Sequence, residues 1–589
     1  MDDLYNARRR ATVPPSRTEQ AVPSLVFAVP TSTRRSAVPG LLFDLALVVL
    51  GGGALLIAIV LWFDNAQGGL TGNGLFKSLE LKPWVVDPAK APLYPSNYLF
   101  YPLYGVLCRL LDVLGVFAGD PRRQMTILNA ASCALSLGVV YLLIRALTAD
   151  RLVALLAALF HLASSFVMFL AIINEDIMPS YTVLLSAMAL GAIWLAKPTA
   201  PRVLAVSVLF SLAWLMEWRL MFPTLPAMLV ALWVCEKRLT WRFAWMALFL
   251  VGVVATAAVV AWAWHGHPGA VGPIDLIWTG KAVRSVWAGF TWAKVGYMWD
   301  GMVAYLLGAG VAAIPGIPGW DIWRWVATVW MLAIAFFALP FLWRHWDDPR
   351  SRALSAIFGV TFVAGEVFNL YSQPQDPQMQ INVMAWLTIG WAVVLVAVRE
   401  RRRYGRRGLA AMAGLTVALF AYNVWSIAPL RGLDSAWEGA IQRMESEGNP
   451  DRTVWLMHDF DWAMVYGSLY WGINDPGTEK LGPAPQKEPR FKWIGFTGQV
   501  LRHPEWTDHE LVQDLRGQID RALDLGYDVL VIRLWDMDPY QLEVATGMVA
   551  SSARIQALRR MMRDDYVATQ AFIDPVVGAV DRLKKKPGR

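Results

Sequence analysis

Long apolar runs separated by short polar loops fill the chain from residue 41 to residue 428, which we predict to be the transmembrane domain (41–428). Most runs reach about 20 residues, the length at which an α-helix crosses a hydrocarbon layer about 30 Å thick. The pattern predicts a mainly α, polytopic helical membrane bundle of about 11 spans. The predicted spans are 41–63, 124–147, 150–172, 178–196, 202–218, 220–235, 243–264, 322–343, 353–371, 380–398 and 409–428.

Two further apolar stretches are not counted as spans. Residues 98–117 carry Pro102, Arg109 and Asp112, and charges are costly at the centre of a bilayer. We therefore predict an interfacial helix there, lying on the outer surface of the membrane. Residues 304–316 are short and glycine-rich, and counting them as a span would move every later arginine-rich loop to the opposite side.

Lysine and arginine gather in alternate loops between the predicted spans. Arg34 lies just before the first span, and a run of arginines beginning at Arg399 lies just before the last. Because cytoplasmic loops are enriched in these residues, we predict a cytoplasmic N-terminal tail (1–40) and outer loops at 64–123 and 265–321. The net charge of +7 then reflects membrane orientation, so membrane lipids are the expected partners and nucleic acid is not.

Beyond residue 428 the composition changes to that of a soluble domain, residues 429–589. Buried strands are predicted at 452–460 and 527–535, and amphipathic helices at 508–526 and 552–565. The alternation predicts a small C-terminal α/β domain on the extracytoplasmic, periplasmic side. No Asn-x-Ser/Thr glycosylation acceptor occurs in the chain, which favours a multi-pass protein of a bacterial inner membrane.

Three carboxylates stand at the outer ends of predicted spans, and each has two interpretations. Asp64 follows the first span, while Glu175 and Asp176 lie side by side before the fourth. Asp64 is either a solvated helix end or a general base whose proton affinity rises at the rim of an apolar bundle. Asn174 or Asp176 caps the fourth span, or the surplus acid binds a metal, a sugar hydroxyl or the acceptor.

The order of these segments resembles that of a known family of membrane enzymes. After Asp64 come the segment YPSNYLFYPLY (94–104), then EDIMP (175–179), and then Arg219 after the fifth span. Over residues 41–240 this order is similar to that of the GT-C glycosyltransferases, in the branch of the lipid A aminoarabinose transferase and the protein O-mannosyltransferases. The chain departs from that branch at two places, where Asn65 replaces a frequent Glu and Tyr94-Pro95-Ser96 replaces a His-Pro-Pro segment.

The resemblance implies transfer of a sugar from a polyprenyl-phosphate donor to an acceptor hydroxyl on the outer face, with inversion. Asp64 would be the catalytic base, Glu175 and Asp176 would orient the acceptor or the base, and Arg219 would hold the donor phosphate. Lipid, glycan and protein acceptors all stay open. No cofactor is implied with certainty, and a divalent metal is left open.

Further substrate-binding candidates come from the polar segments of the outer loops. Cations near a departing phosphate stabilise its developing charge, and amides bind sugar hydroxyls. Arg219 has an alternative role in an ion pair with Glu217 or a lipid headgroup, and the other charged candidates have one as solvated residues. The candidates are Tyr94, Asn97, Lys281, Arg284, Lys294, Glu366, Gln373 and Gln375.

A transporter or flippase of lipid-linked or small solutes is the alternative function, and a receptor with an outer sensing domain is a third. Transporters place ionisable residues and broken helices near the midplane of the membrane. The charged residues within predicted spans, Asp44, Glu217 and Glu366, lie near span ends instead. Acidic residues gathered on the outer side of the membrane fit an enzyme that acts on that side better than a transporter with alternating access.

Overall fold

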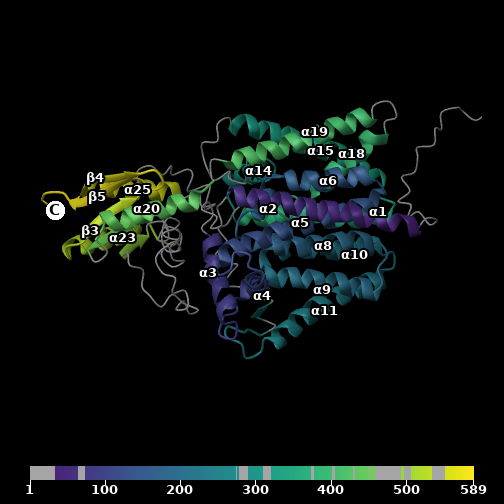
Figure 1. Cartoon of the computed structure of the whole chain (residues 1–589), viewed down its shortest axis with the longest axis horizontal. Helices are drawn as coiled ribbons and strands as arrows, with labels where there is room; N and C mark the ends of the chain where they lie inside the picture. Colours follow the sequence, from purple (N-terminus) through teal and green to yellow (C-terminus); the bar gives the residue numbers. More distant parts are fainter. Residues whose placement is uncertain are drawn as a thin grey trace, which may run out of the picture.

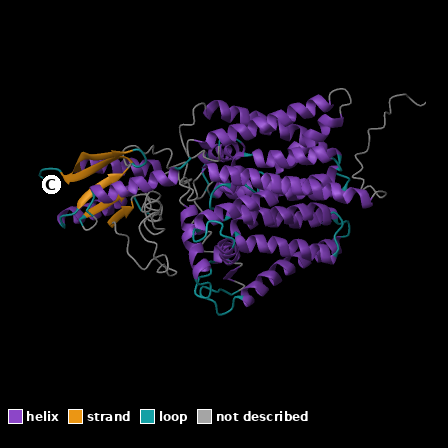
Figure 2. Cartoon of the chain, viewed as in Figure 1, coloured by secondary structure: helices purple, strands orange, loops and turns teal. Residues whose placement is uncertain are grey.

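The computed structural model combines a bundle of long helices with a smaller sheet domain beyond one end of it (Figures 1 and 2). That end of the bundle is called the sheet end, and the opposite one the far end. The structure describes residues 34–63, 73–272, 275–276, 290–308, 320–372, 374, 377–400, 405–428, 431–449, 452–457, 492–495, 506–532 and 551–588.

Each of the eleven predicted spans corresponds to a helix or a helix pair in the described part of the chain. The first is α1 (Arg34–Ala46), a π-helical turn and α2 (Gly52–Phe63). By length and composition eight helices can cross a membrane, or nine with one bent pair, and two are shorter. The fold class is thus confirmed. The remaining spans are α5 (Pro121–Thr148), α6 (Arg151–Ala163) with α7 (Ser165–Ala171), α8 (Ile177–Trp194), α9 (Ala200–Met216), α10 (Met221–Cys235), α11 (Leu239–Ala263), α15 (Trp320–Arg344), α16 (Pro349–Tyr371), α18 (Trp386–Glu400) and α19 (Gly405–Ile427).

The third predicted span is not one helix, because α6 and α7 meet at an angle of 72°. Ser164 lies at the break in an extended conformation, and its hydroxyl donates to the backbone oxygen of His161 at 2.7 Å. Hydroxyl bonds of this kind bend helices. The side chain of Asn423 donates to the free carbonyl of Ala163 at 2.6 Å. The bend leads the chain through α7 to the polar segment at 172–176.

At the far end, charged residues tie the first span to the neighbouring helices. Asp44 of α1 is buried, accepts a hydrogen bond from Tyr141 at 2.7 Å and pairs with Arg151. Arg399, at the end of α18, pairs with Asp150 at the start of α6. Asp44 is therefore held in place by an ion pair and a hydrogen bond near the end of the first span.

Two shorter helices cross the sheet end of the bundle instead of running along the spans (Figure 1). They are α3 (Asn73–Val86) and α4 (Phe100–Val113). Helix α4 lies within the predicted interfacial segment 98–117, whereas α3 was not predicted. The two pack closely, since a Cβ on Gly105 would lie 2.9 Å from the backbone oxygen of Trp84.

The chain between α3 and α4 is fastened to the end of α11. The ring of His267 stacks on Trp84 with centroids 5.1 Å apart, and its Nε2 lies 2.9 Å from the backbone oxygen of Pro88. Leu93 donates its N–H to the backbone oxygen of Pro268 at 2.9 Å. These contacts hold α3 and α4 in place over the bundle, where they form the roof of the candidate site.

Another helix at the sheet end, α14 (Ala293–Leu306), includes the first residues of the stretch 304–316 that was rejected as a span. It is not among the helices long and apolar enough to cross a membrane in the described part of the chain. Residues 309–319 lie outside the described residues, so the rest of that stretch is not placed.

The sheet domain has five described strands in the order β2-β1-β3-β5-β4. Strand β1 pairs in parallel with β2 and β3, and β5 pairs antiparallel with β3 and β4. The two predicted strands and both predicted helices are present, while β2 and the β4–β5 hairpin were not foreseen. The elements are α20 (Leu433–Glu447), β1 (Thr453–Met457), β2 (Lys492–Gly495), α23 (Asp508–Asp524), β3 (Asp528–Ile532), α25 (Ser551–Asp565), β4 (Tyr566–Asp574) and β5 (Gly578–Lys585).

Apolar side chains pack on both faces of this sheet. Residues of α23 and α25 cover one face and residues of α20 cover the other. Helix α23 begins with a capping box, in which Thr507 and Glu510 bond each other's backbone N–H, a motif that fixes helix starts. The domain is therefore a three-layer α/β unit with its own core, separate from the core of the bundle.

Candidate functional site

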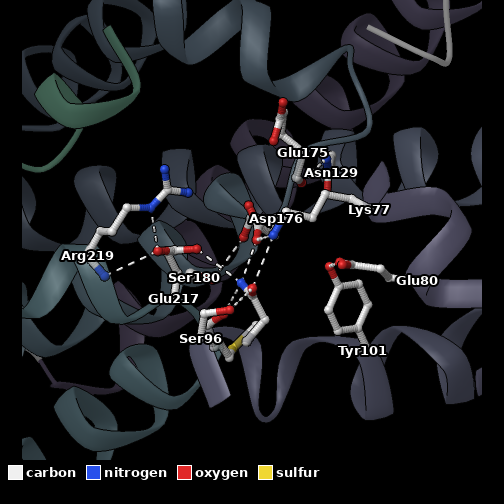
Figure 3. Close-up of polar contacts among 12 residues, drawn as sticks. Lys77, Glu80, Ser96, Tyr101, Asn129, Glu175, Asp176, Ser180, Glu217 and Arg219 are labelled. Atoms are coloured by element: carbon white, nitrogen blue, oxygen red, sulfur yellow. Dashed lines mark hydrogen bonds and ion pairs between the residues drawn. The ribbon is translucent and has the colours of Figure 1, made fainter. Parts of the chain in front are cut away.

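Four segments that are distant in sequence meet under α3 and α4 at the sheet end. They are α3 itself, the turn Pro95–Asn97 before α4, the segment 172–176 before α8, and the break between α9 and α10 at 217–220. Figure 3 shows Asp176 between Lys77 of α3 and the pair Glu217–Arg219. Three of the predicted site residues, Asn97, Asp176 and Arg219, belong to this group.

Lys77 of α3 forms an ion pair with Asp176. The Lys77 Nζ lies 2.6 Å from Asp176 Oδ2, and the exposed fractions of the two side chains are 17% and 0%. An ion pair this deep loses much of its hydration, so each charge depends on the other for stability. Lys77 was not among the predicted site residues.

Asn97 joins this ion pair to a second one. Its Oδ1 accepts from Lys77 Nζ at 3.1 Å, and its Nδ2 donates to Asp176 Oδ2 and lies 3.0 Å from Glu217 Oε2. Asn97 is buried. Its amide therefore fixes two carboxylates and one cation relative to one another, which is a positioning role and differs from the predicted sugar contact.

The second ion pair links Glu217 and Arg219 at the break between α9 and α10. Arg219 Nε lies 2.7 Å from Glu217 Oε1, which also accepts the backbone N–H of Arg219 at 3.2 Å. This is the alternative partner considered from the sequence. The Arg219 side chain stays 17% exposed. It borders a small hollow that is also lined by Ile177, Glu217, Leu220, Pro223, Phe368, Asn369, Gln378, Met379 and Asn382.

The capping interpretation of the acidic pair is wrong for the side chain of Asp176. Asp176 occupies the N-cap position of α8 but makes no side-chain capping bond, because its carboxylate is turned toward Lys77. Asn174 donates instead to Ser78 Oγ of α3. Glu175 points away from this group (Figure 3), and its backbone oxygen accepts from Asn129 at 2.6 Å. The two adjacent acids therefore do not share one cluster.

A third carboxylate, Glu80, lies one turn beyond Lys77 on α3 and accepts a hydrogen bond from Tyr101 of α4. Burial raises the pKa of Glu80 above its ordinary value, although Lys77 and Tyr101 oppose this. Burial, reinforced by Glu80, raises the pKa of Tyr94 to about 12. Tyr94, a predicted contact, packs edge-on against Tyr101 with ring centroids 5.2 Å apart.

The charged states of Lys77 and Asp176 support each other. Burial alone would lower the pKa of Lys77, but Asp176, Glu80 and Glu217 outweigh it and raise the pKa above its ordinary value. Burial would raise the pKa of Asp176, but Lys77 and Arg219 bring the pKa below its ordinary value. Both groups therefore stay charged across the neutral range.

This pair gives a prediction for the dependence of stability on pH. Asp176, with its lowered pKa, stabilises the fold above its unfolded pKa of about 3.9, and the contribution is lost as pH falls through the folded pKa. Asp176→Asn should lower stability by about 3 kcal/mol at neutral pH, and by less in acid. Thermal melts from about pH 2 to 7, a range that extends below the unfolded pKa, measure the difference by tryptophan fluorescence. A difference in thermal stability between variant and wild type that does not change with pH would contradict a stabilising role for the ionised Asp176 carboxylate.

The other sequence candidates fall into two groups. Lys294 and Glu366 are buried near the sheet ends of α14 and α16, and burial lowers the pKa of Lys294 to about 8. The remaining candidates lie outside the described residues, so their roles stay predictions. They are Asp64, Lys281, Arg284, Gln373 and Gln375.

The sequence carries a signal for the missed residues of α3. The stretch LFKSLELKPWVV (75–86) places Lys77 and Glu80 three residues apart between apolar positions, and residues at that spacing share one face of a helix. Glu217 was noted only as a partner of Arg219. In the described part of the chain, no group of three or more His, Cys, Asp or Glu side chains is arranged to hold a metal ion.

Comparisons with known proteins place the chain near two solved structures. No family model matches the sequence, and no curated protein matches it. ArnT from Cupriavidus metallidurans bound to undecaprenyl phosphate has 14% identity and a TM-score of 0.47, over 90% of this chain and 97% of that one. The apo state of ArnT has 16% identity and a TM-score of 0.36, over 90% and 98%.

ArnT is a GT-C aminoarabinose transferase, so the neighbours come from the branch that the sequence resembles. The support for a function comes from the residues of the chain and from the site that they form.

Proposed function

We propose that the chain is a GT-C-type glycosyltransferase that moves a sugar from a polyprenyl-phosphate donor to an acceptor hydroxyl at the outer face of a bacterial inner membrane. The observation that carries this proposal is the pair of partly exposed cations, Lys77 and Arg219, which Asp176, Glu217 and Asn97 hold at the sheet end. Fixed cations suit a reaction whose leaving group is a phosphate.

In the proposed reaction, the acceptor oxygen attacks C1 of the sugar as the bond from C1 to the phosphate oxygen breaks. The acceptor proton passes to Asp64, and polyprenyl phosphate leaves with inversion at C1. Negative charge grows on the departing phosphate, and preorganised cations stabilise it without reorganising. Lys77 and Arg219 would supply that charge, while Asp176 and Glu217 hold them in place. Glu175 would act on the acceptor side.

An apolar groove in the bundle offers a place for the polyprenyl chain. It runs between α14, α15, α16 and α18, and the residues that line it include Phe358, Gly359 and Phe362. Farther along α16, Asn369 lines the hollow beside Arg219. From Phe358 to Asn369 the helix rises about 16 Å, so one helix runs from the apolar groove to the charged site.

Filling this groove should impair long-chain donors selectively. A Cβ on Gly359 would meet no atom within 4 Å, so Gly359→Phe places its ring in the groove without disturbing the helix. We expect the KM of an undecaprenyl-phosphate donor to rise about tenfold, a loss of about 1.4 kcal/mol. The KM of a short-chain prenyl-phosphate donor should not change.

The matched control for this variant is Gly414→Phe. Gly414 lies on α19, where an added Cβ is equally free of contacts, and it does not line the groove. This control should leave both donors unaffected. An equal rise in KM for long and short donors in Gly359→Phe would show that the chain binds elsewhere.

The proposed function is tested with the purified full-length protein in lipid nanodiscs. Undecaprenyl phosphate carrying a radiolabelled hexose or pentose is supplied with lipid, glycan and peptide acceptors, and release of undecaprenyl phosphate is followed with transfer of label. Transfer supports the proposal. Movement of labelled lipid across proteoliposomes without cleavage of the sugar–phosphate bond would favour a flippase and overturn it.

The sheet domain has a proposed role on the acceptor side. Helix α20 follows the last span closely, and Gly432 donates its N–H to the backbone oxygen of Phe63 at the end of the first span, at 3.2 Å. The domain is thereby joined to the segment that leads into Asp64. We infer that it shapes the approach of the acceptor hydroxyl.

A further inference from the structure

A second buried polar group lies at the sheet end of α16, separate from the two ion pairs. Gln380 Nε2 donates to Glu366 Oε2 at 3.3 Å, and Lys294 Nζ donates to the backbone oxygen of Ser372 at 2.8 Å. All four residues are buried. Together Lys294, Glu366, Ser372 and Gln380 are called the Glu366 cluster.

Two oxygen atoms of the Glu366 cluster accept no hydrogen bond within the described part of the chain. They are Glu366 Oε1 and Gln380 Oε1. Buried polar groups in proteins are nearly always hydrogen-bonded, and an unsatisfied one costs about 1–3 kcal/mol, more when it is charged. Two such acceptors beside each other are therefore suited to receive hydrogen bonds from another molecule.

The Glu366 cluster adjoins the hollow beside Arg219. Asn369, one turn after Glu366 on α16, lines that hollow, and so does Gln378, which shares the short helix α17 (Pro377–Gln380) with Gln380. Arg219 lines the same hollow. A molecule whose anionic group pairs with Arg219 can therefore direct its next group toward Glu366 and Gln380.

The chemistry of the open acceptors selects among the parts of a donor. An ionised phosphate cannot donate hydrogen bonds to the two open acceptor oxygens. An apolar chain would leave both acceptors unsatisfied. Sugar hydroxyls donate hydrogen bonds from neighbouring ring positions, so a sugar can satisfy both acceptors at once.

We propose that the Glu366 cluster is the subsite that recognises the sugar of the donor, with Glu366 Oε1 and Gln380 Oε1 accepting hydrogen bonds from its hydroxyls. This inference rests on the proposed function and names the residues that set its sugar specificity. A site built to bond a hydroxyl discriminates strongly against molecules that lack it.

The experiment compares binding of three lipids: undecaprenyl phosphate without a sugar and two forms of it that carry different sugars. Full-length protein in nanodiscs is titrated with undecaprenyl phosphate, and with undecaprenyl phosphate carrying glucose or arabinose. Wild type should bind one of the two sugar-bearing lipids more tightly than undecaprenyl phosphate. Glu366→Ala should raise the Kd of that sugar-bearing lipid about tenfold. The Kd of undecaprenyl phosphate should stay within about twofold of the wild-type value.

Two more variants keep the test informative if Glu366→Ala folds poorly. Glu366→Gln retains the size of the side chain but replaces one acceptor by a donor, and should also lose the preference for sugar. Thr361→Ala, a buried position on the same helix, is the matched control and should bind all lipids as wild type does.

Three outcomes overturn the inference. They are equal weakening of both lipid classes by the Glu366 variants, unchanged binding of both, and a wild type that does not distinguish a sugar-bearing lipid from undecaprenyl phosphate. Failure of wild type to bind any of these lipids would instead contradict the proposed function. The proposal of a sugar subsite, which rests on that function, would then be wrong as well.

Discussion

Lys77→Met is expected to reduce sugar transfer about a thousandfold, a loss typical of removing one preorganised group that stabilises developing charge. Lys77 is the cation of α3, and its Nζ lies 2.6 Å from Asp176 Oδ2 with 17% of the side chain exposed. In the proposed reaction it faces the departing phosphate. The rate of label transfer from undecaprenyl-phosphate sugar measures the loss, and Lys77→Arg should retain more activity because it retains the charge.

A purely structural effect of Lys77→Met is the main competing explanation. Losing the cation leaves the buried carboxylate of Asp176 without its ion-pair partner, which costs about 3–5 kcal/mol. The double variant Lys77→Met/Asp176→Asn removes both charges and should recover most of the thermal stability. If the double variant also recovers transfer, Lys77 acts only on the fold; if it stays inactive, Lys77 acts on the phosphate.

Lys90→Met provides the matched control for a lost lysine near the site. Lys90 follows α3 and pairs with Asp87 at 3.0 Å, but its side chain is 82% exposed. Surface ion pairs of this kind contribute about 0–1 kcal/mol. Transfer should stay within about twofold of wild type, which separates the effect at Lys77 from a general effect of lost positive charge.

The spans could be predicted from the sequence because each is recorded in a continuous apolar run. The limits of α10 and α16 agree with their runs within a few residues. The bend at Ser164 could not be predicted in the same way, because no proline marks it. It depends on a hydroxyl bond to His161 and on Asn423, a residue from a span far along the chain.

The candidate site was only partly predictable for a related reason. Asp176, Asn97 and Arg219 stood out because each is polar at the end of an apolar run. Lys77 lies on a helix with a mixed pattern, typical of a helix that crosses a bundle end, and its partner Asp176 is 99 positions away. Local spacing cannot show such a pair, whereas it suggested the capping role for Asp176 that the structure contradicts.

Asp64→Asn is the second variant with a large expected effect. In the proposed reaction Asp64 accepts the acceptor proton, and a positioned general base contributes about 10²–10⁴ in rate. We expect transfer to fall by about a thousandfold while binding of undecaprenyl phosphate is kept, since asparagine cannot accept the proton. In the sequence Asp64 directly follows Phe63, the last residue of the first span.

The pH dependence of transfer tests the role of Asp64 more directly than the rate alone. A base that must be ionised gives kcat/KM a limb that falls in acid, and Asp64→Asn should abolish that limb in its residual activity. Asp87→Asn, an exposed acid of the same loop, should keep both the rate and the limb. Retention of the acid limb in Asp64→Asn would assign proton transfer to another carboxylate, and Glu175, which points away from the two ion pairs, would be the next one to replace.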